Sequence, residues 1–463
     1  MAAKNLNGKD LRQLGFPEGK LLGAVLDTLD RHYKGKSKKH KTELIQNLLL
    51  EPAFYKNHPH FNEISLGLLQ KEKDTRKPTL KKHHQPYRIY GVEGIAKGAL
   101  DQMEIAMRLP VTHSGALMPD AHQGYGLPIG GVLATNRAVI PYGVGVDIGC
   151  RMCLSVLPSP VSILKNQLTH LKKILLENTQ FGRSEFKLPL DHPVLERVEF
   201  NDIRVLNQLK DKAHRQIGTS GGGNHFVEFG LVELLNDSFG IAAGTYLALL
   251  SHSGSRGLGA SVAAHYTKIA MEQCQLPKEA RHLAWLDLDT EAGQEYWQAM
   301  TLAGDYASAN HHQIHHRIEK ALGEKSILRI ENHHNFAWKE KDADGNEIIV
   351  HRKGATPAGV GAIGIIPGSM TSPGFIVRGK GNLTAINSAS HGAGRVLSRR
   401  KAQKLLKKAE VAKHLQEAGV ELIGSGLDEA PMVYKDIHQV MAFQQDLVEV
   451  LGRFIPKIIR MEG

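Results

Sequence analysis

The segment Gly218-Thr-Ser-Gly-Gly-Gly-Asn-His-Phe-Val-Glu228 decides the local fold of a central part of the chain. Its three consecutive glycines rule out a regular helix and allow backbone angles with positive φ. The apolar residues that follow predict a strand, so Asn224 and His225 should project just before it, with Glu228 at the far end of the segment. The glycines also suit a phosphate, but the Lys-Ser/Thr ending of a P-loop is absent, which argues against a Walker-type NTPase. Taken alone, the segment fits a glycine turn with a structural histidine equally well.

Four further loops have a similar composition. Three of them contain histidine, namely Ser251-His-Ser-Gly-Ser-Arg-Gly257, Asn332-His-His-Asn335 and Ser390-His-Gly-Ala-Gly-Arg395, and the fourth is Pro141-Tyr-Gly-Val-Gly-Val-Asp-Ile-Gly-Cys150. Together the five loops supply imidazoles, a thiolate, a carboxylate and glycine-lined backbone amides. A metal-dependent nucleotidyl-transfer site needs this mixture of groups. A chain with 25 histidines contains some such loops by chance, but five of them together favour a shared site.

Asp147 and Cys150 are candidate metal ligands. They lie three residues apart, so a tight turn would bring a carboxylate and a thiolate to one metal centre, and a thiolate can bridge two cations. His333 and His334 follow an expected strand, where one neutral imidazole could bind a metal and Asn335 could orient a phosphate. Each residue also has a structural explanation, such as a buried cysteine, a turn-capping aspartate or a hydrogen-bonded histidine.

Two positions suit a phosphate group. His252 is expected at a helix start, four residues before Arg256, and backbone amides with an arginine there would hold an anionic phosphate. His391 is the candidate nucleophile, because it lies immediately before an expected basic helix whose N-terminus would stabilise phosphate charge, while Gly392 and Gly394 leave room. Neutral histidine attacks phosphorus well, and its phosphoramidate is labile enough to pass the group onward. A helix-capping role is the alternative for His391.

Length, cysteine content and hydropathy limit the class of protein. The 463 residues, 41% hydrophobic and 23% charged, fit a globular enzyme larger than one typical domain. Three cysteines cannot form a disulfide framework, and the lack of an apolar leader or a run of membrane-spanning length predicts a cytoplasmic protein with no membrane partner. Cys150 and Cys153 form one C-x2-C pair, but a structural zinc site of that type needs a second pair, and no thioredoxin-like pattern surrounds this one.

The first part of the chain differs from the rest in charge. Residues 1–90 contain 18 Lys and Arg against 9 Asp and Glu, so they carry +9 of the total net charge of +11. Apolar residues recur at helical spacing over 21–29 and 44–49, with the lysine-rich segment 34–41 between these helices and a polar linker at 71–85. A basic head on a neutral body predicts a polyanion partner, RNA or DNA. A solvated, lysine-rich surface that aids solubility is the alternative.

From Tyr90 onward, expected strands and helices alternate with glycine-rich loops. The apolar runs predict strands at 131–134, 246–250, 327–330 and 375–377, and helices at 258–273 and 394–417. We therefore expect an α+β fold, with one large catalytic domain over residues 86–463 and a central metal cleft, preceded by a small basic helical domain over residues 1–85.

These motifs resemble the RtcB family of RNA ligases over about Tyr90 to Gly463. The segments that carry the resemblance are Met118-Pro-Asp-Ala-His-Gln-Gly-Tyr-Gly-Leu-Pro-Ile-Gly-Gly131, Gly-Asn-His-Phe-Val-Glu228, His-Ser-Gly-Ser-Arg-Gly-Leu-Gly259, His351-Arg-Lys-Gly-Ala-Thr356, Pro367-Gly-Ser-Met370, Asp428-Glu-Ala-Pro431 and Tyr434-Lys-Asp-Ile437. The resemblance implies a GTP- and Mn²⁺-dependent ligase that joins an RNA 3′-phosphate or 2′,3′-cyclic phosphate to a 5′-hydroxyl. RNA is the implied partner, and an archease-like activator is a possible second one.

The resemblance also implies a role for individual residues. One Mn²⁺ is held by Cys150, His252 and His334, and a second by Asp147, Cys150 and His225. His391 becomes guanylylated. The implied guanylate-binding residues are Asn224, Phe226, Glu228, Asn335, Ser369, Gly392, Gly394, Arg395 and Tyr434, with Glu228 reading the base. A Cys/His site by itself would equally suit Zn²⁺.

Three positions depart from the family pattern. Arg151 stands where many members have glycine, Gly374 stands where a second phosphate- or ribose-contacting serine is expected, and the chain ends in Arg460-Met-Glu-Gly463 where Lys-Gly is common. Arg460 is the candidate replacement for the guanine-contacting lysine. The alternatives are a binuclear metal phosphoesterase, an end-capping nucleotidyltransferase, and an RNA-binding protein with a degenerate site. Neither the phosphoesterase nor the binding protein predicts a guanylylated histidine.

A second, shorter resemblance concerns the N-terminal region. Leu6-Asn-Gly-Lys-Asp-Leu11 followed by Leu14-Gly-Phe-Pro-Glu-Gly19 is similar to a helical motif in the RNA-binding region of tRNA nucleotidyltransferases. Together with the positive charge, this motif predicts an accessory domain that grips tRNA.

Overall fold

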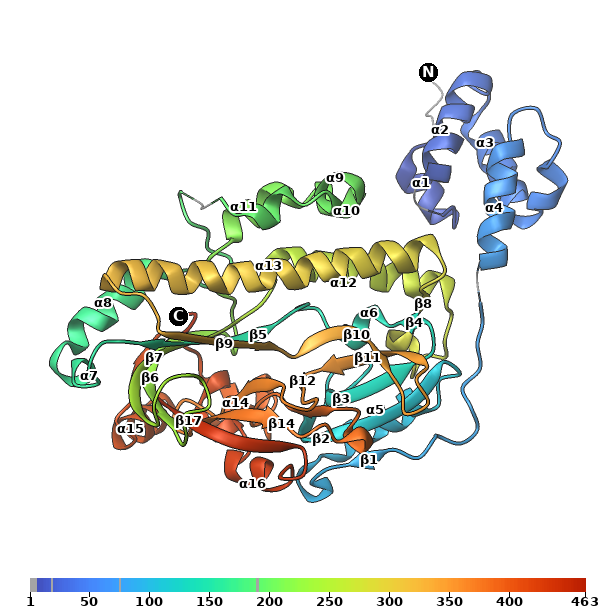
Figure 1. Ribbon diagram of the computed structural model, residues 1–463. Helices are drawn as coiled ribbons and strands as arrows, with labels where there is room; N and C mark the ends of the chain where they lie inside the picture. The colour runs from blue at the N-terminus through green and yellow to red at the C-terminus, as the bar shows by residue number, and fades with distance from the viewer. Residues whose placement is uncertain (1–5, 18–19, 75, 189–190) are drawn as a thin grey trace. The chain divides into compact units, whose positions relative to one another are not determined.

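The computed structural model describes residues 6–17, 20–74, 76–188 and 191–463. The chain divides into two compact units, residues 1–77 and 78–463 (Figure 1). Glu18 and Gly19 of the N-terminal motif, and Thr75 of the expected linker, lie outside the described residues.

The described part of the N-terminal unit is helical. It contains α1 (Gly8–Gln13), α2 (Lys20–His32), α3 (Lys38–Leu50), the 3₁₀ helix η1 (Pro52–Tyr55) and α4 (Asn62–Asp74). Asn7 caps α1 through a reciprocal capping box with Asp10, and Ser37 caps α3. Because Ser37 starts that helix, the expected lysine-rich connection at 34–41 is wrong in its second half, which is helical. Leu11, Val25, Ile45, Leu48 and Phe61 are fully buried in this unit's own core.

The larger sheet of the C-terminal unit is almost entirely antiparallel. Its strands follow the order β13 (Ile363–Ile366), β14 (Gly374–Gly379), β17 (Val448–Arg460), β6 (Phe226–Leu234), β7 (Gly244–Ser253), β5 (Arg151–Leu157) and β9 (Leu328–His333), and β16 (Glu421–Ile423) adds a parallel strand beside β17. The side chain of Asn332 on β9 accepts from the Ile365 N–H and donates to the Ile365 carbonyl oxygen on β13. The sheet therefore curls until its two ends lie side by side.

A second, five-stranded sheet adjoins the first through the chain at His334. Its order is β1 (Arg88–Ile89), β2 (Thr112–His122), β3 (Ile129–Thr135), β11 (Glu347–Lys353) and β10 (Asn335–Lys341). Because β9 ends at His333 and β10 begins at Asn335, His334 stands where the backbone leaves one sheet and enters the other. The short pairs β12 (Ala355–Pro357) with β15 (Ser388–Ser390), and β4 (Ala138–Val139) with β8 (Leu286–Asp287), complete the strands.

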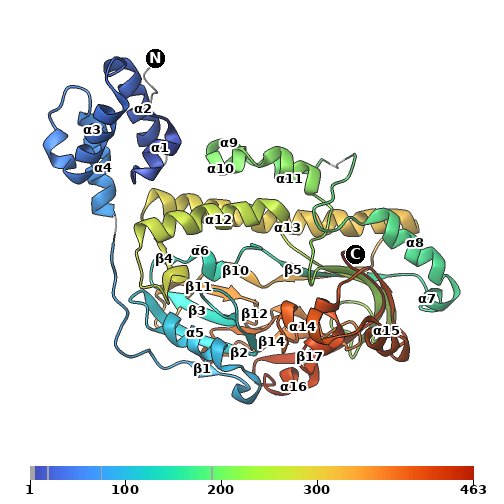
Figure 2. The same ribbon diagram turned by 180° about the vertical axis from the view of Figure 1, so that it is seen from behind.

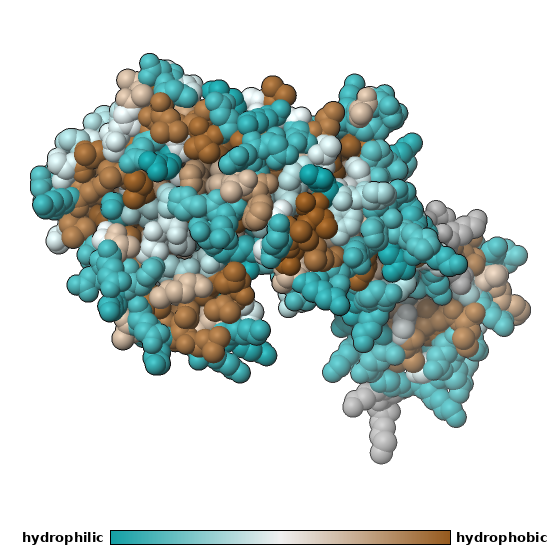
Figure 3. Space-filling view, turned by 90° about the horizontal axis from the view of Figure 1, so that it is seen from below, coloured by the Kyte–Doolittle hydropathy of each residue, from teal (hydrophilic) through white to brown (hydrophobic). Residues whose placement is uncertain are grey.

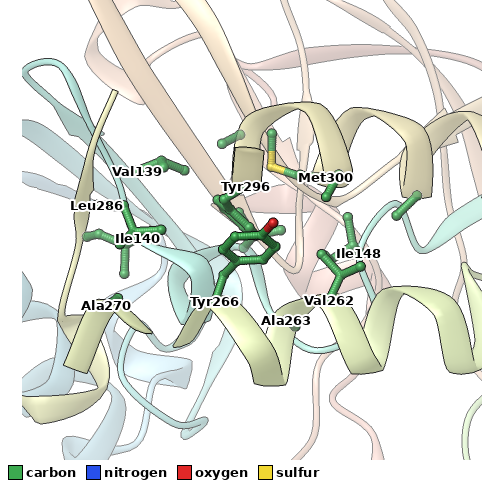
Figure 4. Packing of buried hydrophobic residues seen from close by; sticks show 14 of the residues in the cluster. Val139, Ile140, Ile148, Val262, Ala263, Tyr266, Ala270, Leu286, Tyr296 and Met300 are labelled. Atoms are coloured by element: carbon green, nitrogen blue, oxygen red, sulfur yellow. The ribbon is translucent and has the colours of Figure 1, made fainter. Parts of the chain in front are cut away.

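Two long helices, α12 (Arg256–Gln273) and α13 (Glu291–Leu322), lie side by side on one face of the larger sheet (Figures 1 and 2). Thr290 caps the start of α13, and Gly323 ends it with a left-handed φ of 72°. The rings of Tyr266 on α12 and Tyr296 on α13 pack at 5.3 Å between the helices, surrounded by aliphatic side chains (Figure 4). Hydrophobic residues on the face shown in Figure 3 form separate patches among hydrophilic ones.

The remaining elements are short. They are α5 (Lys97–Met107), α6 (Pro141–Val144), α7 (Ile163–Asn166), α8 (Leu168–Asn178), α9 (Glu199–Asp202), α10 (Arg204–Asn207), α11 (Lys210–Gln216), α14 (Arg399–Leu405), α15 (Lys408–Glu417), α16 (Ile437–Ala442) and the 3₁₀ helices η2 (Val92–Gly94), η3 (Pro193–Glu196), η4 (Arg281–Leu283), η5 (Leu383–Ala385), η6 (Leu427–Glu429) and η7 (Pro431–Val433). Among the described residues, no helix combines the length and apolar character that crossing a membrane requires.

The expected strands at 131–134, 246–250 and 375–377 lie within β3, β7 and β14, and the helix at 258–273 lies within α12. The expected strand at 327–330 starts one residue early, since β9 begins at Leu328. The single helix expected over 394–417 is wrong. Residues 394–398 are not helical, Ser398 caps α14, and the chain is extended at Leu406 before α15. Gly394, with a φ of 74°, cannot continue a right-handed helix.

Candidate active site and metal centre

Cys150 is the centre of a buried cluster built by a turn that precedes β5. Its N–H donates to the Asp147 carbonyl oxygen at 3.2 Å, which brings both side chains to one side of the turn. Gly149 in this turn has a φ of 71°, and a Cβ atom there would lie 2.8 Å from the Cα of Gly304. The turn therefore needs glycine for both its conformation and its approach to α13.

Three histidines converge on this turn from different strands. His225 immediately precedes β6, His252 lies in β7 opposite Phe226, and His334 joins β9 to β10 while its N–H donates to the Cys150 carbonyl oxygen at 3.0 Å. The Cys150 Sγ atom lies 3.4 Å from His225 Nε2 and 3.2 Å from His252 Nε2. His252 Nε2 lies 3.2 Å from His334 Nε2. The helix start expected at His252 is thus four residues later, at Arg256.

These residues form two overlapping groups of potential metal ligands that share one sulfur. The first is Cys150, His252 and His334, and the second is Asp147, Cys150 and His225; within each group the ligand atoms lie within 4.8 Å of one another. Asp147 Oδ2 lies 3.0 Å from His225 Nε2 and has no hydrogen-bond partner among the described residues. A shared cation would stabilise potential ligand atoms that approach one another this closely.

The protonation properties of His252 and Cys150 also favour a bound cation. The His252 Nδ1–H donates to the Asn224 carbonyl oxygen at 2.9 Å, which leaves the electron pair on Nε2 facing Cys150. Burial lowers the pKa of His252 well below its ordinary value, so this imidazole is neutral. Burial, and then the Asp147 carboxylate, raise the pKa of the Cys150 thiol well above its ordinary value. A thiolate there needs a positive partner, which a divalent cation would provide.

His391 stands beside the cluster and is oriented by a buried carboxylate. Its ring centroid lies 4.9 Å from that of His334. Asp120, fully buried at the end of β2, accepts from the His391 N–H at 3.1 Å and from Nδ1 at 2.6 Å. Burial alone would raise the pKa of Asp120, but the charge and hydrogen bond of His391, with Lys435 nearby, hold it below its ordinary value. Asp120 therefore accepts from Nδ1 as a carboxylate, which leaves Nε2 as the ring nitrogen of His391 that can act on a substrate.

The structure corrects the helix-based explanation for His391. His391 directly follows β15, and the next helix along the chain begins at Arg399, so His391 does not stand immediately before a helix. Gly394 makes room for a different neighbour, since a Cβ atom there would lie 2.0 Å from the Asp120 carbonyl oxygen. Asp120 was missed as a site residue, although it lies in the segment 118–131 that carries part of the family resemblance.

A cavity of about 960 Å³ opens beside His391 and His252. The residues expected around a guanylate that line it are Asn224, Phe226, Glu228, Ser369, Gly392, Gly394, Arg395 and Tyr434. Asn335 is the exception, because it lies outside the lining, with its Nδ2 donating to the Asp147 carbonyl oxygen and its Oδ1 accepting from the Gly354 N–H. Burial without a counter-charge raises the pKa of Glu228 well above its ordinary value.

Arg395, expected to bind the guanylate, and Arg256, expected to contact a phosphate, both have hydrogen-bond partners within the protein. Arg395 donates to the Glu429 carboxylate at 3.0 Å and to the Asp428 carbonyl oxygen at 2.6 Å. Arg256, the first residue of α12, donates to Thr219 Oγ1 at 3.0 Å and to the Gly182 carbonyl oxygen. Arg256 does not line the cavity, so in this structure its guanidinium holds the loops around the site.

The three departures from the family pattern have different surroundings. Arg151 is buried, where it donates to the Gly304 carbonyl oxygen at 2.9 Å and pairs with Glu331 at 3.3 Å. Gly374 lines the cavity, and a Cβ atom there would lie 3.3 Å from the Cα of Pro367. Arg460 donates to Thr179 Oγ1 at 2.9 Å and lies outside the cavity lining, so it is not positioned to replace a guanine-contacting lysine.

Comparison with known proteins agrees with this geometry. A family model described as tRNA-splicing ligase RtcB matches residues 102–197 and 194–461, which include the cluster, His391 and every residue of the cavity lining except Ala96. The chain belongs to the RtcB family. The RNA-splicing ligase RtcB of Escherichia coli strain K12 is 35% identical over 365 residues, covering 73% of this chain and 87% of that protein. The tRNA-splicing ligase RtcB of Nanoarchaeum equitans is 31% identical over 452 residues, covering 81% and 95%.

A third relative from the RtcB family matches a similar share of this chain. The RNA-splicing ligase RtcB of Mycobacterium tuberculosis is 29% identical over 417 residues, covering 75% of this chain and 96% of that protein. The RtcB family match begins at residue 102, so the N-terminal unit lies outside it.

Proposed function

We propose that the protein is an RNA ligase that uses GTP and two Mn²⁺ ions to join an RNA 3′-phosphate or 2′,3′-cyclic phosphate to a 5′-hydroxyl. The observation that carries this proposal is the position of His391. Its Nδ1 is held by buried Asp120, while its ring stands between the Cys150 cluster and a cavity that would accept a nucleotide. The RtcB relatives named above are RNA-splicing or tRNA-splicing ligases.

The geometry of His391 supports the first step of this proposal. Its Nε2 attacks the α-phosphorus of GTP, a P–N bond forms, and the P–O bond to pyrophosphate breaks so that pyrophosphate leaves. Asp120 keeps the proton on Nδ1 and stabilises the positive charge that develops on the imidazole. A 2′,3′-cyclic end would first be opened by water to a 3′-phosphate and a 2′-hydroxyl. A 3′-phosphate oxygen of RNA then attacks the guanylate phosphorus and releases His391. Attack of the 5′-hydroxyl on the activated 3′-phosphorus finally releases GMP.

Cys150, His252 and His334 would hold one metal ion, and Asp147, Cys150 and His225 the other. Bound divalent ions supply charge neutralisation and orientation for the reacting phosphates. The choice of manganese rests on the family resemblance, because a Cys/His donor set alone also suits zinc.

Incubation with α-labelled GTP and Mn²⁺ tests the proposal directly. We expect a covalent label that is labile in acid and stable in alkali, as a phosphoramidate is. A binuclear phosphoesterase would open cyclic phosphates without nucleotide and would leave the protein unlabelled. An end-capping enzyme would be labelled but would leave an RNA 3′-phosphate capped and unjoined.

Replacing Asp120 by asparagine should slow guanylylation strongly. Asparagine has nearly the same shape, but its amide can donate to Nδ1, which favours the wrong imidazole tautomer and moves the proton onto Nε2. We expect a fall of roughly 10²-fold or more in the single-turnover labelling rate. Metal content measured by mass spectrometry should stay unchanged, because Asp120 belongs to neither ligand group. An unchanged labelling rate would remove Asp120 from this role.

Glu228 should make GTP binding depend on pH. Burial raises the pKa of its carboxyl, so in the free protein it keeps its proton to a higher pH than an exposed glutamate does. The N1–H and amino group of guanine donate hydrogen bonds that favour the carboxylate, and binding would therefore release a proton. We expect GTP affinity to rise with pH, from the ordinary carboxylic acid range up to the raised pKa of Glu228.

The control for this pH dependence is Glu228→Gln. It should lose this component and bind GTP about tenfold or more weakly, because a charged hydrogen bond contributes roughly 1.5–3 kcal/mol. Isothermal titration calorimetry in buffers of different ionisation enthalpy measures both the affinity and the proton release. Equal pH profiles for the two proteins would contradict this role for Glu228.

We further propose that the N-terminal unit grips folded RNA. Its deletion should end at Lys77, because residues beyond it belong to the C-terminal unit: Leu80 packs on that unit's core, and Lys81 and Arg108 exchange hydrogen bonds of 2.8 Å. Removing residues 1–77 should leave guanylylation nearly unchanged. Affinity for a cleaved tRNA should fall, and its salt dependence should become shallower, because fewer phosphates are neutralised.

A short single-stranded substrate serves as the control for the deletion and should be affected less. If the N-terminal unit only stabilises the C-terminal unit, the deletion will lower the melting temperature and guanylylation together, and the salt slope will stay the same. The archease-like partner and the cytoplasmic location stay predictions.

A further inference from the structure

A second buried cluster of cysteine and histidine lies between the larger sheet and helix α13. Cys153 on β5 and His311 and His315 on α13 offer ligand atoms that lie within 4.8 Å of one another, and all three residues are buried. None of them belongs to the two groups around Cys150, and the ligase chemistry proposed above uses none of them.

The regular repeats of helix α13 and strand β5 bring these residues together. His311 and His315 are four residues apart, so they share one face of α13. Cys153 lies opposite Ser251 in the antiparallel pair of β5 and β7, so their side chains stand next to each other on one face of the sheet. The helix lies across this part of the sheet (Figures 1 and 2).

The hydroxyl of Ser251 stands at the meeting point of the two imidazoles. It lies 2.6 Å from His311 Nδ1 and 2.8 Å from His315 Nε2. The other ring nitrogen of His315 is 2.8 Å from Ser155 Oγ, which already accepts from Arg329 Nε at 3.0 Å. One hydroxyl has one proton, so Ser251 can donate to only one of the two imidazoles.

Hydrogen bonds within the protein do not pair every polar atom of this cluster. His311 Nε2 is buried and makes no hydrogen bond of ordinary distance and angle among the described residues, with the Ser253 backbone as a weaker partner of this ring. An unpaired buried polar atom is unfavourable, and native structures contain few of them. Burial lowers the pKa of His311 to about 3 and that of His315 well below its ordinary value, so both rings are in the neutral form that binds metal ions.

We propose that Cys153, His311 and His315 form a structural zinc site, with the Ser251 hydroxyl beside it. A set of one thiolate and two imidazoles binds Zn²⁺ more tightly than Mn²⁺. Zinc bonds of about 2.3 Å to sulfur and about 2.0 Å to nitrogen allow ligand atoms this close to share one ion after small side-chain movements. On binding, the S–H bond of Cys153 breaks, its proton leaves to solvent, and the sulfur electron pair forms the Zn–S bond.

The site would fix a helix that supports the catalytic loops. Asn310 adjoins His311, and its Oδ1 accepts from the Gly218 N–H at 2.8 Å. Its Nδ2 donates to the carbonyl oxygens of Thr219 at 3.0 Å and Gly254 at 3.3 Å. A zinc ion that joins α13 to β5 would therefore help to position the two glycine loops that precede His225 and follow His252.

The test uses the full chain with Cys150 replaced by alanine, which removes the shared sulfur of the other two groups. Zinc content is measured after dialysis, and cobalt is then exchanged in to detect thiolate-to-cobalt absorption. We expect about one tightly bound zinc per chain and a clear absorption band in Cys150→Ala, since structural sites hold zinc firmly. Both should be lost, at least tenfold in occupancy, when Cys153→Ala is added.

Cys274→Ala added to Cys150→Ala is the matched control, because Cys274 is also buried but lies outside the cluster. It should keep the zinc and the absorption band. Absence of zinc and of cobalt absorption in Cys150→Ala itself would overturn the proposal, and so would a band that survives the loss of Cys153. If the double variant fails to fold, His315→Gln in the same background decides, with loss of the ion expected and full retention contradicting the site. GTP labelling is not measured here, so failure of the ligase proposal leaves this result unaffected.

Discussion

His391→Ala is expected to abolish covalent labelling by GTP while the fold and the metal content stay the same. His391 contributes the attacking Nε2, and among the described residues no other histidine that lines the cavity has its Nδ1 held by a buried carboxylate. We expect a loss of at least roughly 10⁴-fold in the labelling rate, as for removal of a nucleophile. The measurement is single-turnover incorporation of label from α-labelled GTP, with circular dichroism and metal analysis on the same sample.

His316→Ala is the matched control for this experiment. It removes an exposed histidine from α13, away from the cavity lining, and should label at the normal rate. Labelling that persists in His391→Ala would show that another residue is the nucleophile, and peptide mapping of the label would then identify it.

Cys150→Ala is expected to be more damaging to the metal centre than the loss of any single histidine of the cluster. Cys150 belongs to both ligand groups, whereas His225 belongs to one and His334 to the other. A bridging thiolate places negative charge between two cations, so its removal weakens both sites together. We expect manganese occupancy to fall by about tenfold or more, to well below one ion per chain.

Manganese content after dialysis, measured by mass spectrometry, tests this expectation. His225→Ala and His334→Ala should each retain part of the manganese, and Cys274→Ala should retain all of it. Two manganese ions bound to Cys150→Ala would show that the cysteine is a structural residue. Zinc measured in the same sample reports on Cys153 separately.

The sequence predicted correctly most of the features that depend on a single helix, strand or loop. The strands that contain 131–134, 246–250 and 375–377 were predictable because apolar runs between glycine-rich turns are local signals. The candidate ligands were predictable because cysteine, aspartate and histidine stand beside glycine or a small polar residue in every loop concerned. The helix expected over 394–417 was wrong because Gly394, Ser398 and Leu406 interrupt a segment whose basic composition favours helix.

Only the tertiary structure could join residues that are far apart in the chain. Asp120 and His391 are 271 positions apart, and no local pattern indicates that one orients the other. The sequence also suggested that Cys153 lacks the partners for a zinc site, because a second cysteine pair is absent. In the folded chain its potential partners are two histidines on α13, brought to it because a helix repeats its face every three to four residues and a strand alternates its faces. The sequence by itself therefore determined the potential metal-binding residues, the loops that carry them and the family. The packing of α13 and β2 against the sheets decided which of these residues meet, because contact between distant segments depends on the whole fold.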